Sequence, residues 1–276
     1  MARFFQFYLP LARDITEKCK KECVSAMDPI TQEVARKLLT QSDAKYIAQE
    51  QPVIFYDTFS GALELKTYIC GECLIVKTGS DWFIHALSEK ADIASAKRDV
   101  QMIRSANENL FAFSFGAPSP EFNGKIGSHK FACKGFSYED PDIRKMTLED
   151  KEKVEICCAA DPDDSQIGQN VAADFLRLFS DFCTAEGIYT LGLFESDKLA
   201  GLVTGETVRE LGLITVSIYV NRAYRQKGYA KRLLSALCST QQEAVYCYSC
   251  VCTNEASAAT AKACGFRYMG SYMKLA

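Results

Sequence analysis

Hydrophobic and polar residues follow strand-like and helix-like patterns most clearly in the second half of the chain. β-Branched and aromatic residues dominate the run LITVSIYV (Leu213–Val220), which predicts a strand. A polar, basic stretch around Gly228 follows, and leucines then recur at helical spacing through Ala230–Cys238. This order predicts a strand, a short basic loop and a helix.

The rest of the second half alternates in the same way between strand and helix patterns. Strands are predicted at 142–146, on both sides of Ser196–Lys198 and at 244–252, and helices over about 148–159, 164–184 and 254–266. The element order β-α-α-β-β-β-α-β-α-β indicates an α/β (α+β) fold around a mixed sheet. The last helix has Asn254 as its expected cap and ends at Gly265 and Phe266.

The first half repeats this order in a weaker form. Helical patterns cover about 10–27, 30–48 and 89–105, and strand patterns cover 52–59, 62–70, 73–79, 81–87 and 109–116. We therefore expect a degenerate structural copy of the second half, although residue-level self-similarity is lacking. Trp82 and His85 lie on one of these strands, where they either line a substrate cleft or belong to the core.

A connecting segment separates the two halves. Residues 116–130 are dense in Pro, Gly, Ser and Asn, which predicts a turn-rich connection, and FACKGF after it predicts one more strand. We place a boundary near Tyr138–Pro141, which gives an N-terminal α/β domain at 1–138 and a second domain at 139–276.

Composition limits the class of protein. The chain has 276 residues, of which 48% are apolar, and a net charge of −3, which fits two soluble domains with substantial cores. No apolar window is long enough for a membrane span. The apolar opening is interrupted by Pro10 and Arg13 and lacks a cleavage site, so a signal peptide is not expected. These features predict a cytoplasmic protein without a membrane partner.

The thirteen cysteines raise the question of a metal site or a disulfide scaffold. Two pairs, Cys70 with Cys73 and Cys247 with Cys250, have the spacing of a zinc knuckle, but they lie far apart in apolar strand-like runs. Most other cysteines fall on apolar helix positions, where a reduced thiol packs as a small hydrophobe. We expect no metal, no disulfide framework and a reducing compartment.

The basic loop carries the most informative chemistry. Five cations, Arg222, Arg225, Lys227, Lys231 and Arg232, lie between Asn221 and Arg232 without an acidic residue. A glycine at a helix start leaves unpaired backbone N–H groups open to an anion, so the loop predicts a phosphate site. The alternative is a surface loop of solvated charges. A nucleic-acid role is not expected, because the cluster is short and has few aromatic residues.

The segment Arg225–Ala230, RQKGYA, matches the pattern Arg/Gln-x-x-Gly-x-Gly/Ala, and in this the chain resembles the GNAT-superfamily acyltransferases. The resemblance covers about residues 142–276 and is greatest to the glycine N-acyltransferase-like branch. It implies a GNAT fold and acetyl-CoA, or another acyl-CoA, as donor. The implied donor-binding residues are Ile218, Tyr219 and Val220 for the pantetheine, Arg225, Gln226, Lys227, Gly228, Tyr229, Ala230 and Lys231 for the pyrophosphate, and Asn254 and Ser257.

Two departures from the family pattern concern catalysis. Ala261 stands where many members have a tyrosine that acts as the acid, and the strand 213–220 has no carboxylate, with Ile214 or Val216 in the usual slots. Our candidate base is therefore Glu206 on the preceding strand, where alternation places Ala200, Leu202, Thr204 and Glu206 on one face. The alternative for Glu206 is a solvated carboxylate. Tyr246, Tyr248 or Ser217 could relay a proton, and the acid stays unassigned.

The function implied by the resemblance is transfer of an acetyl or other acyl group from acyl-CoA to a primary amine, by direct attack in a ternary complex. The acceptor is a small molecule or a peptide. The alternative is a non-catalytic acyl-CoA sensor or interaction module, which the missing acid and base favour. The sequence leaves the acceptor, the acyl-chain length and the oligomeric state open.

Overall fold

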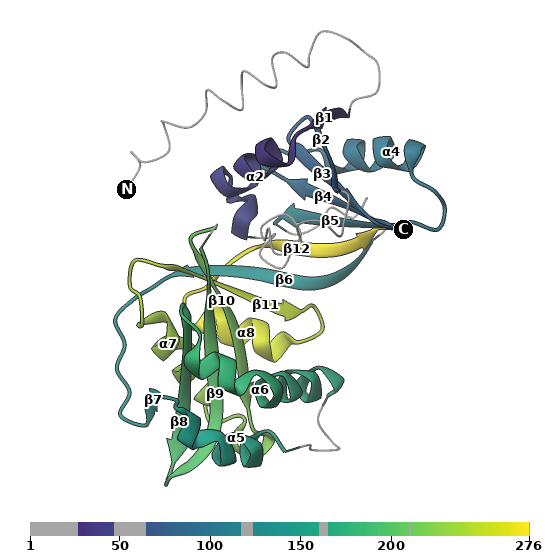
Figure 1. The fold of residues 1–276 in the computed structure, drawn as a ribbon. Coiled ribbons are helices and arrows are strands. Elements are labelled where there is room, and N and C mark those ends of the chain that lie inside the picture. Colours follow the sequence, from purple (N-terminus) through teal and green to yellow (C-terminus); the bar gives the residue numbers. More distant parts are fainter. Residues whose placement is uncertain (1–26, 47–64, 117–123, 160–164, 210, 276) are drawn as a thin grey trace. The chain divides into compact units, whose positions relative to one another are not determined.

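The structure is a computed structural model that describes residues 27–46, 65–116, 124–159, 165–209 and 211–275 (Figure 1). The predicted helix at 10–27 and the predicted strand at 52–59 therefore lie almost wholly outside the described residues. Contacts divide the chain into unit 1, formed by residues 1–128 with 270–276, and unit 2, formed by residues 129–269. The domain boundary that we place near Tyr138–Pro141 stays a prediction.

Unit 2 contains a mixed sheet. Its strands are β7 (Ile143–Lys145), β8 (Ile188–Glu195), β9 (Lys198–Val208), β10 (Leu213–Val220) and β11 (Val245–Val251), together with parts of β6 (Gly124–Lys134) and β12 (Arg267–Leu275). Neighbouring strands from β7 to β10 are antiparallel, whereas β10 and β11 are parallel. The parallel pair is joined by α7 (Tyr229–Cys238), as the pattern around Gly228 predicts.

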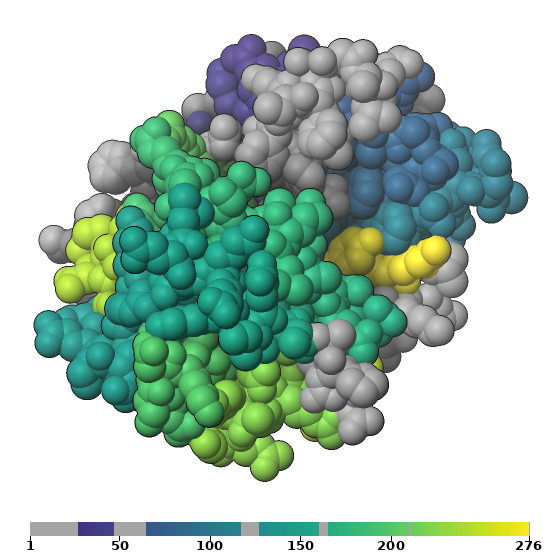
Figure 2. Space-filling view, turned by 60° about the horizontal axis from the view of Figure 1, so that its bottom comes forward, coloured from purple at the N-terminus to yellow at the C-terminus, as the bar shows by residue number. Residues whose placement is uncertain are grey.

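Helices cover both faces of this sheet (Figure 1). On one face lie α7 and α8 (Glu255–Ala263), and Leu233, Leu234 and Leu237 of α7 are fully buried in one core cluster. On the other lie α5 (Lys151–Cys157) and α6 (Gln166–Thr184), the teal and green atoms of Figure 2, which pack in a second cluster. The predicted α/β fold with its order of strands and helices is confirmed.

The strands of unit 1 are also mixed in direction. Its elements are β1 (Asp28–Ile30), α2 (Gln32–Gln41), a 3₁₀ turn at Asp43–Tyr46, β2 (Leu65–Cys70), β3 (Cys73–Thr78), β4 (Asp81–Ala86), α4 (Ile93–Ile103) and β5 (Asn109–Phe115). The strands run antiparallel from β1 to β4, and β4 is parallel to β5. Helix α4 buries Ile93, Ala96 and Val100 against one face of this sheet.

The two units repeat one topology. In each, three antiparallel strands are followed by a helix and a parallel neighbour, β2-β3-β4-α4-β5 in unit 1 and β8-β9-β10-α7-β11 in unit 2. The last strands are exchanged, because residues 270–275 of β12 pair with β5 in unit 1 and residues 129–134 of β6 belong to unit 2. Residues 124–130 belong to strand β6, which lies between β11 and β12 in the sheet. The prediction of a turn-rich connection is therefore wrong for these residues.

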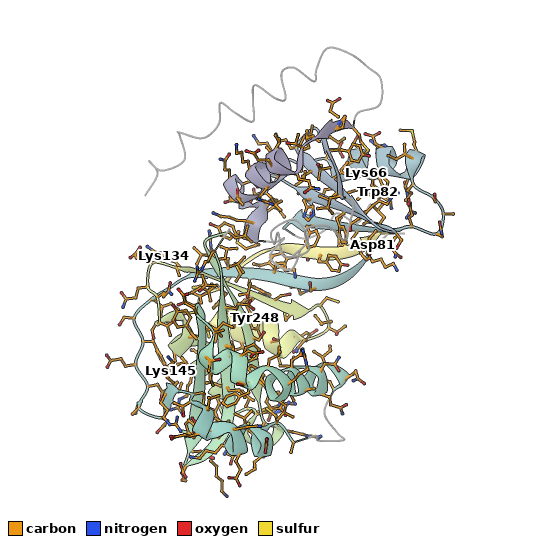
Figure 3. The ribbon with its side chains drawn as sticks, viewed as in Figure 1. Lys66, Asp81, Trp82, Lys134, Lys145 and Tyr248 are labelled. Atoms are coloured by element: carbon orange, nitrogen blue, oxygen red, sulfur yellow. The ribbon has the colours of Figure 1, made fainter. Side chains whose placement is uncertain are left out.

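Trp82 and His85 are core residues of unit 1, in agreement with the second interpretation of the sequence. Trp82, labelled in Figure 3, is 3% exposed, and its Nε1 donates to Glu108 Oε2 at 2.8 Å. His85 is fully buried and stacks on Phe113, with ring centroids 4.7 Å apart. Neither ring nitrogen of His85 has a hydrogen-bond partner, and burial lowers its pKa to about 3.

A polar clamp ties the segment before β7 to α7 within unit 2. Arg232 donates from Nε to Asp140 Oδ2 at 2.7 Å, and its Nη2 lies 2.6 Å from both Asp140 Oδ1 and Asp142 Oδ2. Tyr138 OH also donates to Asp140, whose side chain is 6% exposed. Hydrogen bonds from Arg232 lower the pKa of Asp140. The clamp fixes the first turn of α7 against the incoming chain.

His85 makes the stability of unit 1 depend on pH. Because the buried imidazole keeps a pKa of about 3 while an unfolded histidine has about 6.5, the unfolded state takes up the proton as the pH falls from 6.5 to 3. Stability is therefore lost over that window by up to about 1.4 kcal/mol per pH unit. We expect wild type to lose about 2 kcal/mol more than His85→Phe between pH 7.5 and 5.

Urea unfolding followed by fluorescence measures this difference, because Trp82 is the one tryptophan of the chain and lies in unit 1. His129→Phe, which alters a partly exposed histidine of unit 2, serves as the control and should change the signal little. Equal pH dependence in wild type and His85→Phe would contradict the assignment.

Asp140→Asn should weaken the clamp. Removing the buried carboxylate charge leaves Arg232 with a poorer partner, so we expect a loss of about 1–3 kcal/mol at pH 7. The contribution is present above the unfolded pKa of about 3.9 and disappears as the pH falls through the lowered folded pKa. Urea unfolding followed by circular dichroism tests this. Asp174→Asn, which breaks an exposed pair with Arg177, should cost less than about 0.5 kcal/mol.

Candidate functional site

Strand β10 takes part in two ladders of different length. Its pairing with β9 continues from Leu213 to Val220, whereas in the described chain its pairing with β11 ends at Val216 and Tyr248. The predicted residues Ile218, Tyr219 and Val220 therefore extend past the end of the β11 ladder. The parallel ladder therefore ends before β10 does, at the carboxyl end of the strands, where ligands of α/β folds commonly bind.

The loop after β10 is held by several hydrogen bonds. Asn221 Oδ1 accepts from Ala223 N at 3.0 Å, and its Nδ2 donates to the carbonyl of Cys157 at 2.8 Å. Arg225 folds back so that its Nε donates to the carbonyl of Val220 at 3.0 Å. These bonds hold the backbone between β10 and α7, which ends at Gly228, the N-cap of α7.

Gly228 starts α7 in the left-handed conformation, with φ 78° and ψ 7°. Tyr229 after it is helical, and this left-handed to right-handed succession turns consecutive N–H groups toward one side, as in an anion-binding nest. The first helical bond joins Arg232 N to Gly228 O, so the N–H groups of Tyr229, Ala230 and Lys231 have no acceptor within the helix. A Cβ on Gly228 would meet no atom within 4 Å, which leaves room for an anion.

The charge of this loop differs from the expectation. Although no acid lies nearby in sequence, Glu195 at the end of β8 accepts from Tyr229 OH at 2.6 Å and forms an ion pair with Lys227 at 3.4 Å. The hydrogen bond from Tyr229 and the charge of Lys227 lower the pKa of Glu195. Arg232 is held by Asp140 and Asp142, so acidic residues from other segments offset part of the positive charge of this loop.

The start of α8 lies beside β11. Asn254 caps the helix, as predicted, because its Oδ1 accepts from Ser257 N at 3.0 Å. Ser257 Oγ also lies 2.5 Å from Tyr248 OH, the residue at which the β10–β11 ladder ends (Figure 3). Burial raises the pKa of Tyr248 to about 12, so this hydroxyl stays protonated. Ala261 is fully buried in the same core cluster.

Glu206 is an exposed residue of β9, opposite Ile188 on β8 and Thr215 on β10. The expectation that Ala200, Leu202, Thr204 and Glu206 share one face is wrong at Ala200. Ala200 belongs to the core cluster of α7, whereas Leu202 belongs to that of α5 and α6. A β-bulge at Ala200 shifts the alternation. Leu193 of β8 pairs with Gly201 and Phe194 pairs with Leu199, so Ala200 has no partner residue on β8 in this ladder.

The structure thus brings most predicted donor-binding residues to the carboxyl ends of β10 and β11. Glu206 lies on the neighbouring strand β9, opposite Thr215. Thr215 is one position before Val216, where the pairing of β10 with β11 ends. The residues missed in sequence are Glu195, Asp140 and Asp142. Topology offers a signal for Glu195, because β8 and β10 run parallel to each other two strands apart and end at the same edge. No local pattern indicates the two aspartates.

The described residues hold no group of three or more His, Cys, Asp and Glu side chains arranged to bind a metal ion. None of their helices is both long and apolar enough to cross a bilayer.

Comparison with known proteins gives the family of this region. Residues 155–266 match the model of the Acetyltransferase (GNAT) family. No curated protein matches the sequence.

Among solved structures, a GNAT-family acetyltransferase from Colwellia psychrerythraea is similar over 91% of this chain and 99% of its own, at 13% identity and a TM-score of 0.54. A Drosophila protein is similar over 92% and 99%, at 11% identity and a TM-score of 0.50. These likenesses show the fold. The family match covers residues 155–266, which include strands β8 to β11 and helices α6 to α8.

Proposed function

We propose that unit 2 binds acetyl-CoA, or another acyl-CoA, and transfers the acyl group to a primary amine of a small molecule or peptide. The observation that carries this proposal is the left-handed Gly228 at the start of α7, one loop after a strand that extends beyond its ladder with β11. A helix start with exposed N–H groups attracts phosphate, and the part of β10 beyond that ladder offers backbone groups to an extended arm.

The proposed donor site has three parts. The N–H groups of Gly228, Tyr229, Ala230 and Lys231, with the backbone of Arg225, Gln226 and Lys227, receive the pyrophosphate. The backbone of Ile218, Tyr219 and Val220, beyond the end of the β11 ladder, pairs with the pantetheine amides. Asn254 and Ser257 lie at the start of α8, beside β11, and their capping bond keeps that helix start in place.

In the proposed reaction, the amine nitrogen attacks the thioester carbonyl carbon, the C–S bond breaks and coenzyme A leaves as a thiolate. The amine must lose one proton, and we propose Glu206 as its acceptor, because it is an exposed carboxylate beside Thr215 of β10. A thiol has a pKa of about 8.5, so the thiolate can leave without a strong acid. The orientation of the amine toward the thioester carbonyl supplies much of the remaining rate enhancement.

The finer assignments are also proposals. We place the chain near the glycine N-acyltransferase-like branch on the residues around Arg225 and Asn254 alone. We propose a cytoplasmic location, because every cysteine of the described residues is free and most are buried, which suits a reducing compartment.

A second function is favoured by one observation. Ala261 is fully buried and carries no hydroxyl, and β10 has no carboxylate, so the domain lacks both usual proton-transfer groups. A protein that binds acyl-CoA as a sensor has no need of them. Release of free thiol from acetyl-CoA with any member of a panel of amines, amino acids and peptides identifies the enzyme. Binding without turnover across the panel identifies the sensor.

Gly228→Asp should abolish acetyl-CoA binding, because a carboxylate at the nest repels the pyrophosphate and an L-residue is strained at φ 78°. Titration calorimetry at millimolar acetyl-CoA measures this. Gly212→Asp is the matched control, since Gly212 also has a positive φ of 62° and open space around it but lies at the opposite end of β10. Unchanged affinity in Gly228→Asp would disprove the loop assignment.

Glu206→Gln should lower kcat by about 10²–10⁴-fold with little change in acetyl-CoA affinity, since a positioned base contributes about that much. Glu186→Gln serves as control, because Glu186 is exposed and lies two residues before Ile188, the neighbour of Glu206. Equal loss in both variants would argue for a general charge effect.

A further inference from the structure

A carboxylate from another segment, Glu195 of β8, contacts the loop around Gly228, although an anion-binding site does not need a negative charge. We propose that Glu195 is an internal counter-ion that competes with the phosphates of the acyl donor for Lys227 and Tyr229, and so sets the affinity for the donor and the rate of product release. This inference rests on the proposed function and assigns a further affinity-determining residue to the same site.

Glu195 is held in place by a tight hairpin. It pairs with Lys198 at the last position of the β8–β9 ladder, and the two turn residues, Ser196 and Asp197, have positive φ values of 49° and 68°. Such a two-residue turn matches the twist of the flanking strands and fixes the register. Asp197 is tied to Lys153 of α5 at 2.6 Å, which anchors the turn further.

The contacts of Glu195 are with the two residues on either side of Gly228. Its Oε1 lies 2.6 Å from Tyr229 OH, and both of its oxygens lie 3.4 Å from Lys227 Nζ. The Lys227 ammonium also lies 5.1 Å from the ring centre of Tyr224 and 5.8 Å from that of Tyr229. Carboxylate, ammonium and two rings therefore form one cluster at the edge of the nest.

The strength of these contacts differs from that of the neighbouring clamp. Arg232 makes three bonds of 2.6–2.7 Å to Asp140 and Asp142, and its side chain is 29% exposed. The pair between Lys227 and Glu195 is longer, and the two side chains are 47% and 40% exposed. An arriving diphosphate can therefore draw Lys227 away from Glu195 more readily than it can draw Arg232 from its partners.

Electrostatics then determines the effect. Without donor, Glu195 neutralises Lys227 and limits repulsion among the basic residues. With donor bound, the carboxylate remains near the phosphates and repels them, which weakens binding and speeds dissociation of coenzyme A after the reaction. Removal of the charge should therefore tighten binding.

The test is Glu195→Gln, which keeps an acceptor for Tyr229 OH but removes the charge. Calorimetry with coenzyme A at low salt should give binding about two- to fivefold tighter than wild type, the range of an exposed ion pair. The gain should shrink at 1 M salt, where charges are screened within about 3 Å. It should be smaller in a Lys227→Met background, where competition for the lysine is gone and direct repulsion remains, and absent for pantetheine, which has no phosphate.

Asp197→Asn is the matched control, because Asp197 is a carboxylate of the same turn that pairs with Lys153 and not with the loop. A gain of the same size in Asp197→Asn, or equal or weaker coenzyme A binding in Glu195→Gln, overturns the role of Glu195. Absence of coenzyme A binding in wild type and variant overturns this inference together with the proposed function. If the wild type binds coenzyme A and Glu195→Gln binds it with the same affinity, this inference is wrong while the proposed function stands.

Discussion

The unequal pairing of β10 is the constraint on which the rest of unit 2 depends. Its ladder with β9 reaches Val220, whereas its ladder with β11 stops at Val216. A loop over residues 221–227 then leads to α7, and the left-handed Gly228 begins that helix. A residue without Cβ adopts this conformation at little cost.

Local signals explain why much of this could be predicted from the sequence. The leucines of α7 and the strand pattern of β10 depend on neighbours within a few residues, and the cap at Asn254 uses a bond to Ser257 only three residues away. Such features are encoded where they occur. The topological repeat could also be expected, because the order of elements in both halves is visible without any tertiary contact.

Features that depend on distant partners could not be predicted. Residues 124–130 look like a turn by composition, but β6 has neighbouring strands more than a hundred residues away, and pairing outweighs local preference. The bulge at Ala200 shifts a side chain to the other face because of its partners on β8. The acids that meet the basic loop, Glu195 and Asp140, are likewise supplied by other segments.

The exchanged strand β12 has a consequence for the nascent protein. Residues 270–275 are synthesised after the whole of unit 2, yet they pair with β5 of unit 1, where Leu275 lies opposite Leu110 and Met273 opposite Ala112. Until then, β5 is an edge strand with unsatisfied backbone groups, which is a risk for aggregation. Unit 1 therefore completes the pairing of β5 only after translation of the whole of unit 2, and changes in residues 270–275 act on unit 1.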